Sequence, residues 1–448
     1  MAKLFGTDGI RGKANTFPLD SSSMELLGYS LGKVIGSSAG HPLEVIIGYD
    51  TRESSIHLLE SISRGFNACK GKILNAGIIS TPVLSFLASY FSHFAIAITA
   101  SHNPYGDNGV KIFGPDGLKL PDDKECEIED FLLQKEHLPL TPAQAISIED
   151  ISQNAHDLYY NKLIKKNFPT LDLHSFNIAI DVAHGSGYRI IPSILRQMGG
   201  NIFVYNDRPD GKNINNNCGA LHPEYLSQCI INKEMHIGIS FDGDADRAIF
   251  CDNTGRVYDG DMILAMIGLY LKSKRKLKNN AIVATIMSNY GLEKYLASHE
   301  IQLLRVPVGD KNVLEKMIEL DLNLGGEQSG HIILSDILKT GDGLITALMA
   351  MSIIKESQMS VESLIKGFER YPQILVNVNV QKKAPLESVP ELYKAYQSIQ
   401  EKLKKDGRLV IRYSGTEPLM RIMIEGPHYQ EIHRYADMLS RIAKKHLN

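Results

Sequence analysis

Residues 178–182 read Ile-Ala-Ile-Asp-Val, a short apolar and β-branched run that leads into a turn of small and polar residues. Two runs of the same kind stand at residues 45–50 (Val-Ile-Ile-Gly-Tyr-Asp) and 282–286 (Ile-Val-Ala-Thr-Ile). Short apolar runs that are bounded by turns and followed by helical periodicity are typical of buried parallel strands in βαβ units. The three runs therefore predict three α/β units built on one plan.

Each unit contains two further predicted strands. The second strands lie at residues 72–74, 201–205 and 302–306, and the third strands at residues 94–99, 236–241 and 322–325. Every third strand leads directly into a loop that is rich in chemically reactive side chains. Because ligands bind beyond the carboxyl ends of the strands in doubly wound sheets, we expect the functional site at these loops.

The pattern changes after about residue 370. A strand, a helix, two paired strands and a basic helix are predicted at residues 373–380, 392–405, 408–413, 419–425 and from about 428 onward. This order predicts an α+β module with an antiparallel sheet. The expected fold class is α/β: three similar α/β domains with mixed, mostly parallel sheets plus a C-terminal α+β domain, around a central cleft. The expected domains are residues 1–155, 156–255, 256–370 and 371–448.

Length and composition agree with several globular domains. The chain has 448 residues, whereas a single hydrophobic core stops growing at about 250–300 residues. Lys and Arg number 48 against 51 for Asp and Glu, and the net charge of −3 argues against a nucleic-acid coat or a polybasic membrane binder. The content of 43% hydrophobic and 22% charged residues is ordinary for a globular protein.

The sequence also indicates a compartment. The five cysteines show no CxxC spacing, so neither a zinc site nor a disulfide framework is expected. The N-terminal residues include Asp8 and Arg11 before any apolar run develops, which argues against a signal peptide. The longest apolar stretches, residues 262–271 and 344–351, are shorter than the ~20 residues needed to span a bilayer. We expect a cytoplasmic protein without membrane or nucleic-acid partners.

The loop after the third strand of the second unit reads Asp242-Gly-Asp244-Ala-Asp246-Arg247. Alternate side chains of an extended segment share one side, so the three carboxylates converge and repel one another unless a cation compensates them. Ligands that are all oxygen select a hard ion such as Mg²⁺. A calcium-binding EF-hand would need Gly where Arg247 stands. A metal site is the favoured interpretation, and a solvated acidic turn is the alternative.

The corresponding loop of the first unit places Ser101 at a strand end, before a His-Asn-Pro turn. Ser101 is a candidate nucleophile. It lacks the G-x-S-x-G elbow of hydrolases, and Ser, Asn and Pro also favour ordinary turns. These residues alone leave a nucleophile and a plain turn equally open.

Two further loops offer groups that suit hydroxyls and a phosphate. In the third unit, paired glycines allow close backbone approach, and Glu327, Ser329 and His331 offer donors and acceptors suited to hydroxyl groups. In the last module, a guanidinium, hydroxyls and backbone N–H groups suit a phosphate. These residues are Arg412, Ser414, Gly415, Thr416 and, further along, Arg421. Taken alone, each loop could also be a structural turn.

The four loops have one joint chemical meaning. Together they supply a candidate nucleophile, an oxygen-rich metal site, a hydroxyl-binding loop and an anion-binding loop, one in each domain. This combination predicts phosphoryl transfer on a hydroxylated, phosphorylated substrate.

The loops TASHNPYGDNGVKIFG (99–114), DGDADR (242–247), GGEQSGH (325–331) and RYSGTEP (412–418), with FGTDGIRG (5–12) at the start, closely resemble the signature loops of the α-D-phosphohexomutases. The resemblance spans essentially the whole chain in the order of that family. The forms FGTDGIRG, DNG and GEQSGH look most like the bacterial members that act on glucosamine phosphates. One segment departs from that pattern: Lys311 and Asn312 stand where the subfamily usually has Arg and Tyr.

The resemblance implies a role for each loop. Ser101 would be the phosphoserine, and one Mg²⁺ per chain would bind to its phosphate and to Asp242, Asp244 and Asp246. Lys111 and His331 would transfer protons, and Arg247 would neutralise phosphoryl charge. Glu327 and Ser329 would bind sugar hydroxyls. The non-reacting phosphate would be bound by Arg412, Ser414, Gly415 and Thr416, with Arg421 beside them.

The implied reaction interconverts glucosamine 6-phosphate and glucosamine 1-phosphate through a 1,6-bisphosphate, for UDP-N-acetylglucosamine and the cell wall. A mutase acting on glucose or mannose phosphates is the nearest alternative. A metal-dependent sugar phosphatase and a non-catalytic sugar-phosphate sensor are more distant ones. The small phosphosugar is the expected partner, and the sequence leaves monomer and homodimer open.

Overall fold

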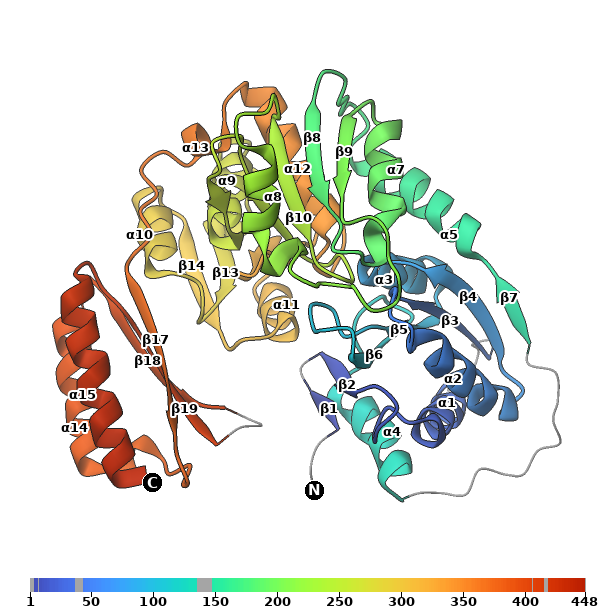
Figure 1. Ribbon diagram of the computed structural model, residues 1–448, viewed down its shortest axis with the longest axis horizontal. Coiled ribbons are helices and arrows are strands. Elements are labelled where there is room, and N and C mark those ends of the chain that lie inside the picture. Colours follow the sequence, from blue (N-terminus) through green and yellow to red (C-terminus); the bar gives the residue numbers. More distant parts are fainter. Residues whose placement is uncertain are drawn as a thin grey trace.

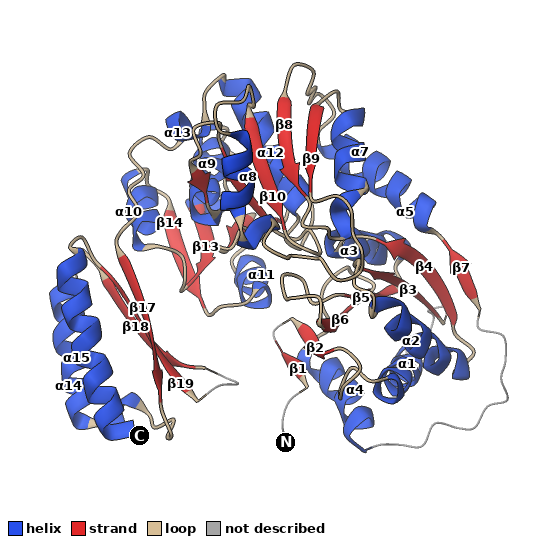
Figure 2. Cartoon of the chain, viewed as in Figure 1, coloured by secondary structure: helices blue, strands red, loops and turns tan. Residues whose placement is uncertain are grey.

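The computed structural model describes residues 4–6, 8–36, 43–134, 147–404, 406–414 and 418–447. Their strands form four sheets that follow one another along the chain (Figures 1 and 2). The first three are mixed sheets flanked by helices, and the fourth is a small antiparallel sheet, so the predicted fold class is confirmed. No helix in these described ranges has the length and apolar character to cross a membrane.

The first sheet has the order β1-β2-β6-β5-β3-β4-β7. Its strands are β1 (Phe5–Gly6), β2 (Gly9–Lys13), β3 (Glu44–Tyr49), β4 (Lys72–Ile78), β5 (Phe94–Ile98), β6 (Asp107–Phe113) and β7 (Ile148–Asp150). Its helices are α1 (Ser21–Gly36), α2 (Ser55–Ala68), α3 (Thr81–Phe91) and α4 (Asp122–Gln134). Val45 and Ile47 pack with α1 and α2, while Ile46 between them packs on the opposite side with α3.

The second sheet has the order β12-β11-β10-β8-β9. Its strands are β8 (Asn177–Asp181), β9 (Asn201–Tyr205), β10 (Ile237–Phe241), β11 (Ala248–Cys251) and β12 (Val257–Tyr258), with helices η2 (Ser186–Tyr188), α7 (Ile190–Gln197), η3 (Gly219–Leu221) and α8 (Pro223–Ile230). The helical connection from the first sheet comprises α5 (Ser152–Leu158), the π-helix η1 (Tyr159–Ile164) and α6 (Lys165–Asn167). The predicted boundaries at 155 and 255 therefore fall inside α5 and inside the β11–β12 hairpin.

The third sheet has the order β14-β13-β15-β16. Its strands are β13 (Ala281–Thr285), β14 (Gln302–Val306), β15 (Leu324–Gly326) and β16 (Ile332–Leu334). Its helices are α9 (Gly260–Ser273), η4 (Lys278–Asn280), α10 (Tyr290–Ser298), α11 (Asp310–Glu319), α12 (Gly343–Ser357) and α13 (Val361–Leu364).

In each α/β sheet the three strands predicted from the sequence are present and pair in parallel. The third of them then pairs antiparallel with the next strand along the chain: β5 with β6, β10 with β11 and β15 with β16. Each loop predicted to carry chemistry is therefore the connection of a hairpin, held by paired strands at both ends. These hairpin partners were not predicted, because each begins within a signature loop or directly after it, without a separate turn signal.

The fourth domain has its own hydrophobic core. It comprises β17 (Gln373–Asn379), η5 (Leu386–Ser388), α14 (Pro390–Leu403), β18 (Arg408–Tyr413), β19 (Leu419–Glu425) and α15 (Tyr429–Leu447). One continuous core runs through the first three domains, whereas the fourth forms a separate cluster. Met420, Ile422 and Ile424 of β19 pack against the helices, so alternation directs Arg421 to the opposite face of the sheet. Figure 1 shows the helices on the outer side, with that uncovered face turned toward the other domains.

Polar contacts join the fourth domain to the third. Glu425 is buried and accepts hydrogen bonds from Arg408 Nε at 2.8 Å and from Asn289 Nδ2 at 3.0 Å. Arg408 also donates to the carbonyl oxygens of Ile286 and Ser288, each at 2.8 Å. The fourth domain is thus held by a few directional bonds rather than by a shared apolar core, an arrangement that permits hinge motion.

Candidate active site

The loop after β5 carries Ser101 at the carboxyl end of the first sheet. Its Oγ donates a hydrogen bond to Oδ2 of Asp242 at 2.8 Å and lies 3.2 Å from Nδ1 of His102. Ser101 is fully buried and has a φ of 51°, in the left-handed region that costs a non-glycine residue free energy. This strained conformation directs the hydroxyl across the boundary to the second domain.

Arg52, just after β3, holds the backbone of this loop. Its side chain is completely buried, and Nε donates to Oδ2 of Asp50 at 2.8 Å. The two terminal nitrogens donate to the carbonyl oxygens of Ser101, Asn103, Pro104 and Asp107. All five guanidinium donors are therefore used, four of them on the loop that contains Ser101.

The backbone of the Asp-rich loop touches the same segment. A Cβ atom on Gly243 would lie 2.6 Å from the carbonyl oxygen of Ser101, so only glycine allows this approach. Asn215 donates from Nδ2 to that carbonyl oxygen at 2.8 Å. The spacing between the serine and the carboxylates is therefore set by direct backbone contact between the two domains.

The three aspartates form a cluster suited to a metal ion. Asp242, Asp244 and Asp246 are buried, and one carboxylate oxygen of each lies within 4.8 Å of the others. Among the described residues, Oδ1 of Asp244 and Oδ1 of Asp246 have no hydrogen-bond partner. Unpaired buried carboxylate oxygens are costly unless a cation compensates them, and Mg²⁺ prefers such hard oxygen ligands. The donor set therefore fits the predicted Mg²⁺ site.

Lys111, on β6, is a buried cation between the first and second domains. Its Nζ lies 2.9 Å from Asp244 Oδ2, 3.1 Å from Asp8 Oδ2 and 3.6 Å from Asp246 Oδ2. Burial lowers the pKa of Lys111, but these carboxylates outweigh burial and raise the pKa above its usual value. Lys111 therefore carries its charge beside the cluster.

His331, in the hairpin loop of the third sheet, is a second titratable side chain near Asp246. Its Nδ1 is 3.5 Å from Asp246 Oδ2, and its backbone pairs with that of Arg247. Burial lowers the pKa of His331, but the Asp246 carboxylate outweighs burial and raises the pKa to about 9. Burial raises the pKa of Asp246, but Lys111 and His331 outweigh burial and hold the pKa below its usual value.

Asp242 is the member of the cluster whose charge the protein's own cations compensate least. Burial, together with Asp246 and Asp244, raises the pKa of Asp242 well above its usual value. Arg247 Nε approaches only to 3.9 Å from Asp242 Oδ2 and 3.7 Å from Asp246 Oδ1. The protein's own cations therefore leave room for one more positive charge at this position.

A cavity of about 180 Å³ opens in front of these groups, with a lining from the first three domains. The lining residues are Asp8, Arg11, His102, Asp246, Arg247, Val308, Gly309, Asp310, Glu327 and His331. Glu327 Oε2 accepts a hydrogen bond from Ser329 Oγ at 3.4 Å. The structure thus places the candidate residues Asp246, Arg247, Glu327 and His331 at one cavity, with Ser101, Lys111, Asp242 and Asp244 buried behind it.

The candidate phosphate-binding residues are not part of this lining. Arg412 and Arg421 are cross-strand neighbours in the β18–β19 pair, on the face of the sheet that the helices leave uncovered. Burial and the neighbouring Arg421 both lower the pKa of Arg412. Ser414 lies at the end of β18, and Gly415 and Thr416 lie outside the described residues. The described residues of this loop therefore stand outside the cavity lining in this structure.

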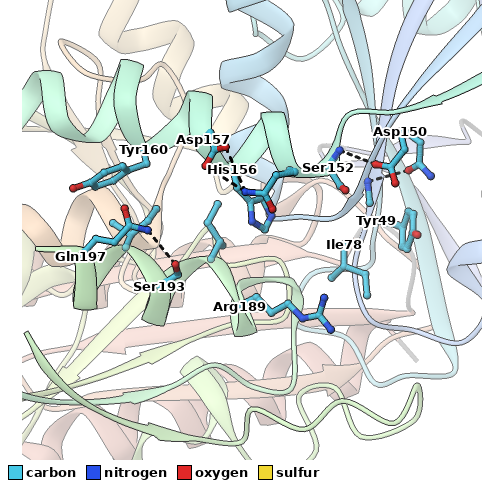
Figure 3. A pocket seen from close by; sticks show the side chains of 15 residues that line it. Tyr49, Ile78, Asp150, Ser152, His156, Asp157, Tyr160, Arg189, Ser193 and Gln197 are labelled. Atoms are coloured by element: carbon cyan, nitrogen blue, oxygen red, sulfur yellow. Dashed lines mark hydrogen bonds between the residues drawn. The ribbon is translucent and has the colours of Figure 1, made fainter.

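A larger cavity of about 480 Å³ lies between α5 and α7. Figure 3 shows Arg189, His156, Asp157 and Tyr160 around it. None of the candidate site residues lines this cavity, so size alone does not locate the site.

Sequence reasoning missed residues that act through the backbone or through distant charges. Arg52 and Asn215 bind the Ser101 loop, Thr81 Oγ1 donates to Asp244 Oδ2 at 2.7 Å, and Lys119 contacts Asp8 and Asp310. For Arg52 the sequence does offer an indication, because the polar residues Asp50, Thr51 and Arg52 directly follow a buried strand. Lys311, which departs from the family pattern, contacts Asp122 and Glu125 of α4 and points away from the cavity.

Four family models for successive domains of phosphoglucomutase/phosphomannomutase match the chain. They match α/β/α domain I at residues 2–138, domain II at 157–255, domain III at 259–371 and the C-terminal domain at 375–442. A phosphoglucosamine mutase of Solibacter usitatus is 39% identical over 450 residues, and one of Thermodesulfovibrio yellowstonii is 40% identical over 455 residues. Both matches cover 100% of this chain and 100% of the relative.

Solved structures share the fold at lower identity. A phosphoglucomutase/phosphomannomutase family protein of Burkholderia thailandensis has a TM-score of 0.79 at 20% identity, covering 100% of this chain and 98% of that chain. An N-acetylphosphoglucosamine mutase of Aspergillus fumigatus, in complex with GlcNAc-6P and magnesium, has a TM-score of 0.67 at 18% identity, covering 99% and 95%. The resemblance to the α-D-phosphohexomutases is therefore confirmed: the chain belongs to the phosphoglucomutase/phosphomannomutase family, and its full-length relatives are phosphoglucosamine mutases.

Proposed function

We propose that the protein interconverts glucosamine 6-phosphate and glucosamine 1-phosphate. The full-length identity to phosphoglucosamine mutases supports the choice of sugar. The observation that carries the chemistry is the 2.8 Å hydrogen bond from Ser101 Oγ to Asp242, which holds a nucleophile against a buried carboxylate cluster. A serine in that position is suited to exchange a phosphoryl group with a sugar hydroxyl.

The transfer begins from phosphorylated Ser101. A free hydroxyl of the sugar phosphate attacks the phosphorus, the bond to Ser101 Oγ breaks, and a 1,6-bisphosphate is released into the cavity. The bisphosphate turns, and its other phosphoryl group returns to Ser101, which leaves the isomeric monophosphate. Mg²⁺ held by Asp242, Asp244 and Asp246 would withdraw negative charge from the phosphoryl group.

The charged side chains around the cluster complete the chemistry. Lys111 and His331 both approach Oδ2 of Asp246, at 3.6 and 3.5 Å, and would exchange a proton with the attacking or leaving oxygen. Arg247 lines the cavity beside the cluster, where its guanidinium neutralises charge on the transferred group. Glu327 and Ser329 offer acceptors and a hydroxyl to the sugar.

The fourth domain binds the phosphate that is not reacting. Arg412 and Arg421 stand side by side on its uncovered face, next to Ser414, and the loop continues through Gly415 and Thr416. A domain with its own core and a polar hinge can close on a bound sugar phosphate and relax while the bisphosphate turns. The product would feed UDP-N-acetylglucosamine synthesis for the cell wall in the cytoplasm, where the five free cysteines would stay reduced.

The test compares glucosamine, glucose and mannose 6-phosphates in a coupled assay with added bisphosphate. We expect the highest kcat/KM with the glucosamine phosphate, and intact-mass analysis should show one phosphoryl group that the Ser101→Ala variant lacks together with turnover. A preference for glucose or mannose phosphates would reassign the sugar. Steady release of inorganic phosphate would indicate a phosphatase. Binding of the sugar phosphate by the wild type without any turnover would indicate a sensor.

A further inference from the structure

Lys119 connects the first and third domains beside the cavity. Its Nζ donates to Oδ1 and Oδ2 of Asp310 at 2.8 and 2.6 Å, and it also contacts Asp8 Oδ1. The Lys119 side chain is only 12% exposed. Both acceptors line the cavity, whereas Lys119 itself does not.

The partner of Lys119 begins the segment that supports the sugar-binding loop. Asp310 is the first residue of α11, and Gly309 before it has φ 126° and ψ 133°, a conformation that L side chains rarely adopt. In this conformation the Gly309 amide donates to Oε1 of Glu327 at 3.2 Å. A continuous path therefore runs from Lys119 through Asp310 and the Gly309 amide to Glu327.

The ion pair stands in the wall between two cavities. Asp310 lines the site cavity and also a second, largely apolar cavity of about 200 Å³, which Lys119 lines as well. Leu118, Leu314, Ile318 and Ile333 are among the apolar side chains of the second cavity. The side chains of Lys119 and Asp310 are only 12% and 17% exposed, so separating the pair would leave two poorly hydrated charges, which is costly.

We propose that Lys119 is a positioning residue for sugar recognition: from the first domain, it holds Asp310 and thereby fixes the orientation of Glu327 in the third. This inference rests on the proposed function and adds a residue to it. Because Lys119 does not reach the reacting atoms, its loss acts on substrate binding and sugar preference more than on the transfer of the phosphoryl group.

The experiment compares Lys119→Met with Lys311→Met. Lys311 also joins the third domain to the first, through Asp122 and the carbonyl oxygen of Leu120. Its contact with Asp310 is made by the backbone amide, which Lys311→Met keeps. We expect Lys119→Met to raise KM for glucosamine phosphate by about 10-fold, which is the effect of losing one charge-assisted hydrogen bond. The ratio of kcat/KM for glucosamine phosphate to kcat/KM for glucose phosphate should fall. Lys311→Met should keep both values, and Lys119→Arg should restore them in part.

Asp310→Asn separates positioning from simple charge. If Lys119 acted only by attracting the phosphosugar, removing the negative charge of Asp310 would lower KM. Positioning predicts the opposite: Asp310→Asn weakens the same contact and raises KM. The double variant should then be little worse than either single variant. Circular dichroism and melting temperatures identify variants that fail to fold.

Unchanged KM and unchanged sugar preference in folded Lys119→Met would overturn the inference, as would a lowered KM in Asp310→Asn. Equal effects of Lys119→Met and Lys311→Met would also overturn it, because general tethering of the domains would then explain both. Failure of the proposed function gives a different result, since the wild type would then show no preference for glucosamine phosphate at all.

Discussion

Ser101 Oγ and Asp242 Oδ2 lie 2.8 Å apart, although the two residues are 141 positions apart in the sequence. They belong to different sheets, and the continuous apolar core of the first three domains holds those sheets together. The contact between the proposed nucleophile and the proposed metal ligand therefore depends on domain packing, whereas the proposed phosphate-binding loop lies on a domain with a separate core. In the proposed function, this division would separate a rigid reaction centre from a mobile substrate clamp.

Loss of the Asp244 carboxylate should weaken metal binding. Asp244→Asn leaves two carboxylates, too few for an ion that dehydrates reluctantly, so the Mg²⁺ concentration for half-maximal activity should rise at least about 10-fold. EDTA should silence the wild type and Mg²⁺ should restore it. The exposed Asp207→Asn in the same domain serves as the control. Full activity of the wild type in metal-free buffer would contradict the metal assignment.

Arg52 should control the position of Ser101. Lysine at this position keeps the charge but loses the planar fork that binds four carbonyl oxygens of the loop. A small displacement of the serine costs about 10²-fold in kcat, so Arg52→Lys should lower kcat with little change in KM. Arg64→Lys, at a partly exposed ion pair with Glu25, provides the matched control. Normal kcat in folded Arg52→Lys would show that the loop keeps its shape without the guanidinium.

Arg421 should act as a clamp for the distal phosphate. Truncation in Arg421→Ala should raise KM and let the 1,6-bisphosphate escape, so that added bisphosphate partly rescues the rate by rephosphorylating Ser101. Chromatography of the reaction mixture would detect the released bisphosphate. Arg434→Ala, on the exposed side of α15, should behave as the wild type. A lowered kcat with unchanged KM and no release would assign the clamp elsewhere.

Asp342 should make stability depend on pH. It caps α12, accepts a hydrogen bond from the Tyr159 hydroxyl at 2.6 Å, and burial raises its pKa from 3.8 to about 6. The folded state then binds a proton more tightly than the unfolded state, so this group stabilises the protein below about pH 4 relative to above pH 6. As the pH rises from about 4 to about 6, the free energy of unfolding of the wild type should fall by on the order of 3 kcal/mol relative to that of Asp342→Asn.

Chemical unfolding of both proteins from pH 4 to pH 7.5 measures this difference. Asparagine keeps an oxygen that can accept from Ile345 N, and its Nδ2 can donate to the Tyr159 hydroxyl oxygen, so the variant should fold. The exposed Asp123→Asn should run parallel to the wild type at every pH. A constant difference between the wild type and Asp342→Asn would refute a raised pKa.

The strands that organise the three α/β domains were predictable because the signal is local. A short β-branched run such as residues 178–182 can be buried on both faces only inside a sheet, and β8 (Asn177–Asp181) covers almost the same residues. The hairpin partners β6, β11 and β16 were not predicted, since each begins within or directly after a loop whose residue types indicate chemistry rather than a strand. Lys111 illustrates this: it sits in β6, yet its charge serves the aspartate cluster.

The sequence by itself determined the fold class and the chemical character of each loop, because residue type and spacing are properties of short segments. The local sequence alone is enough to recognise the aspartates at alternate positions, the serine at a strand end and the glycine pair. Only the tertiary structure decided which of these groups meet. The contact of Ser101 with Asp242, the hold of Arg52 on the loop and the reach of Lys119 to Asp310 all join segments far apart in the chain. These long-range contacts follow from the packing of apolar faces of different domains, and no local sequence pattern encodes them.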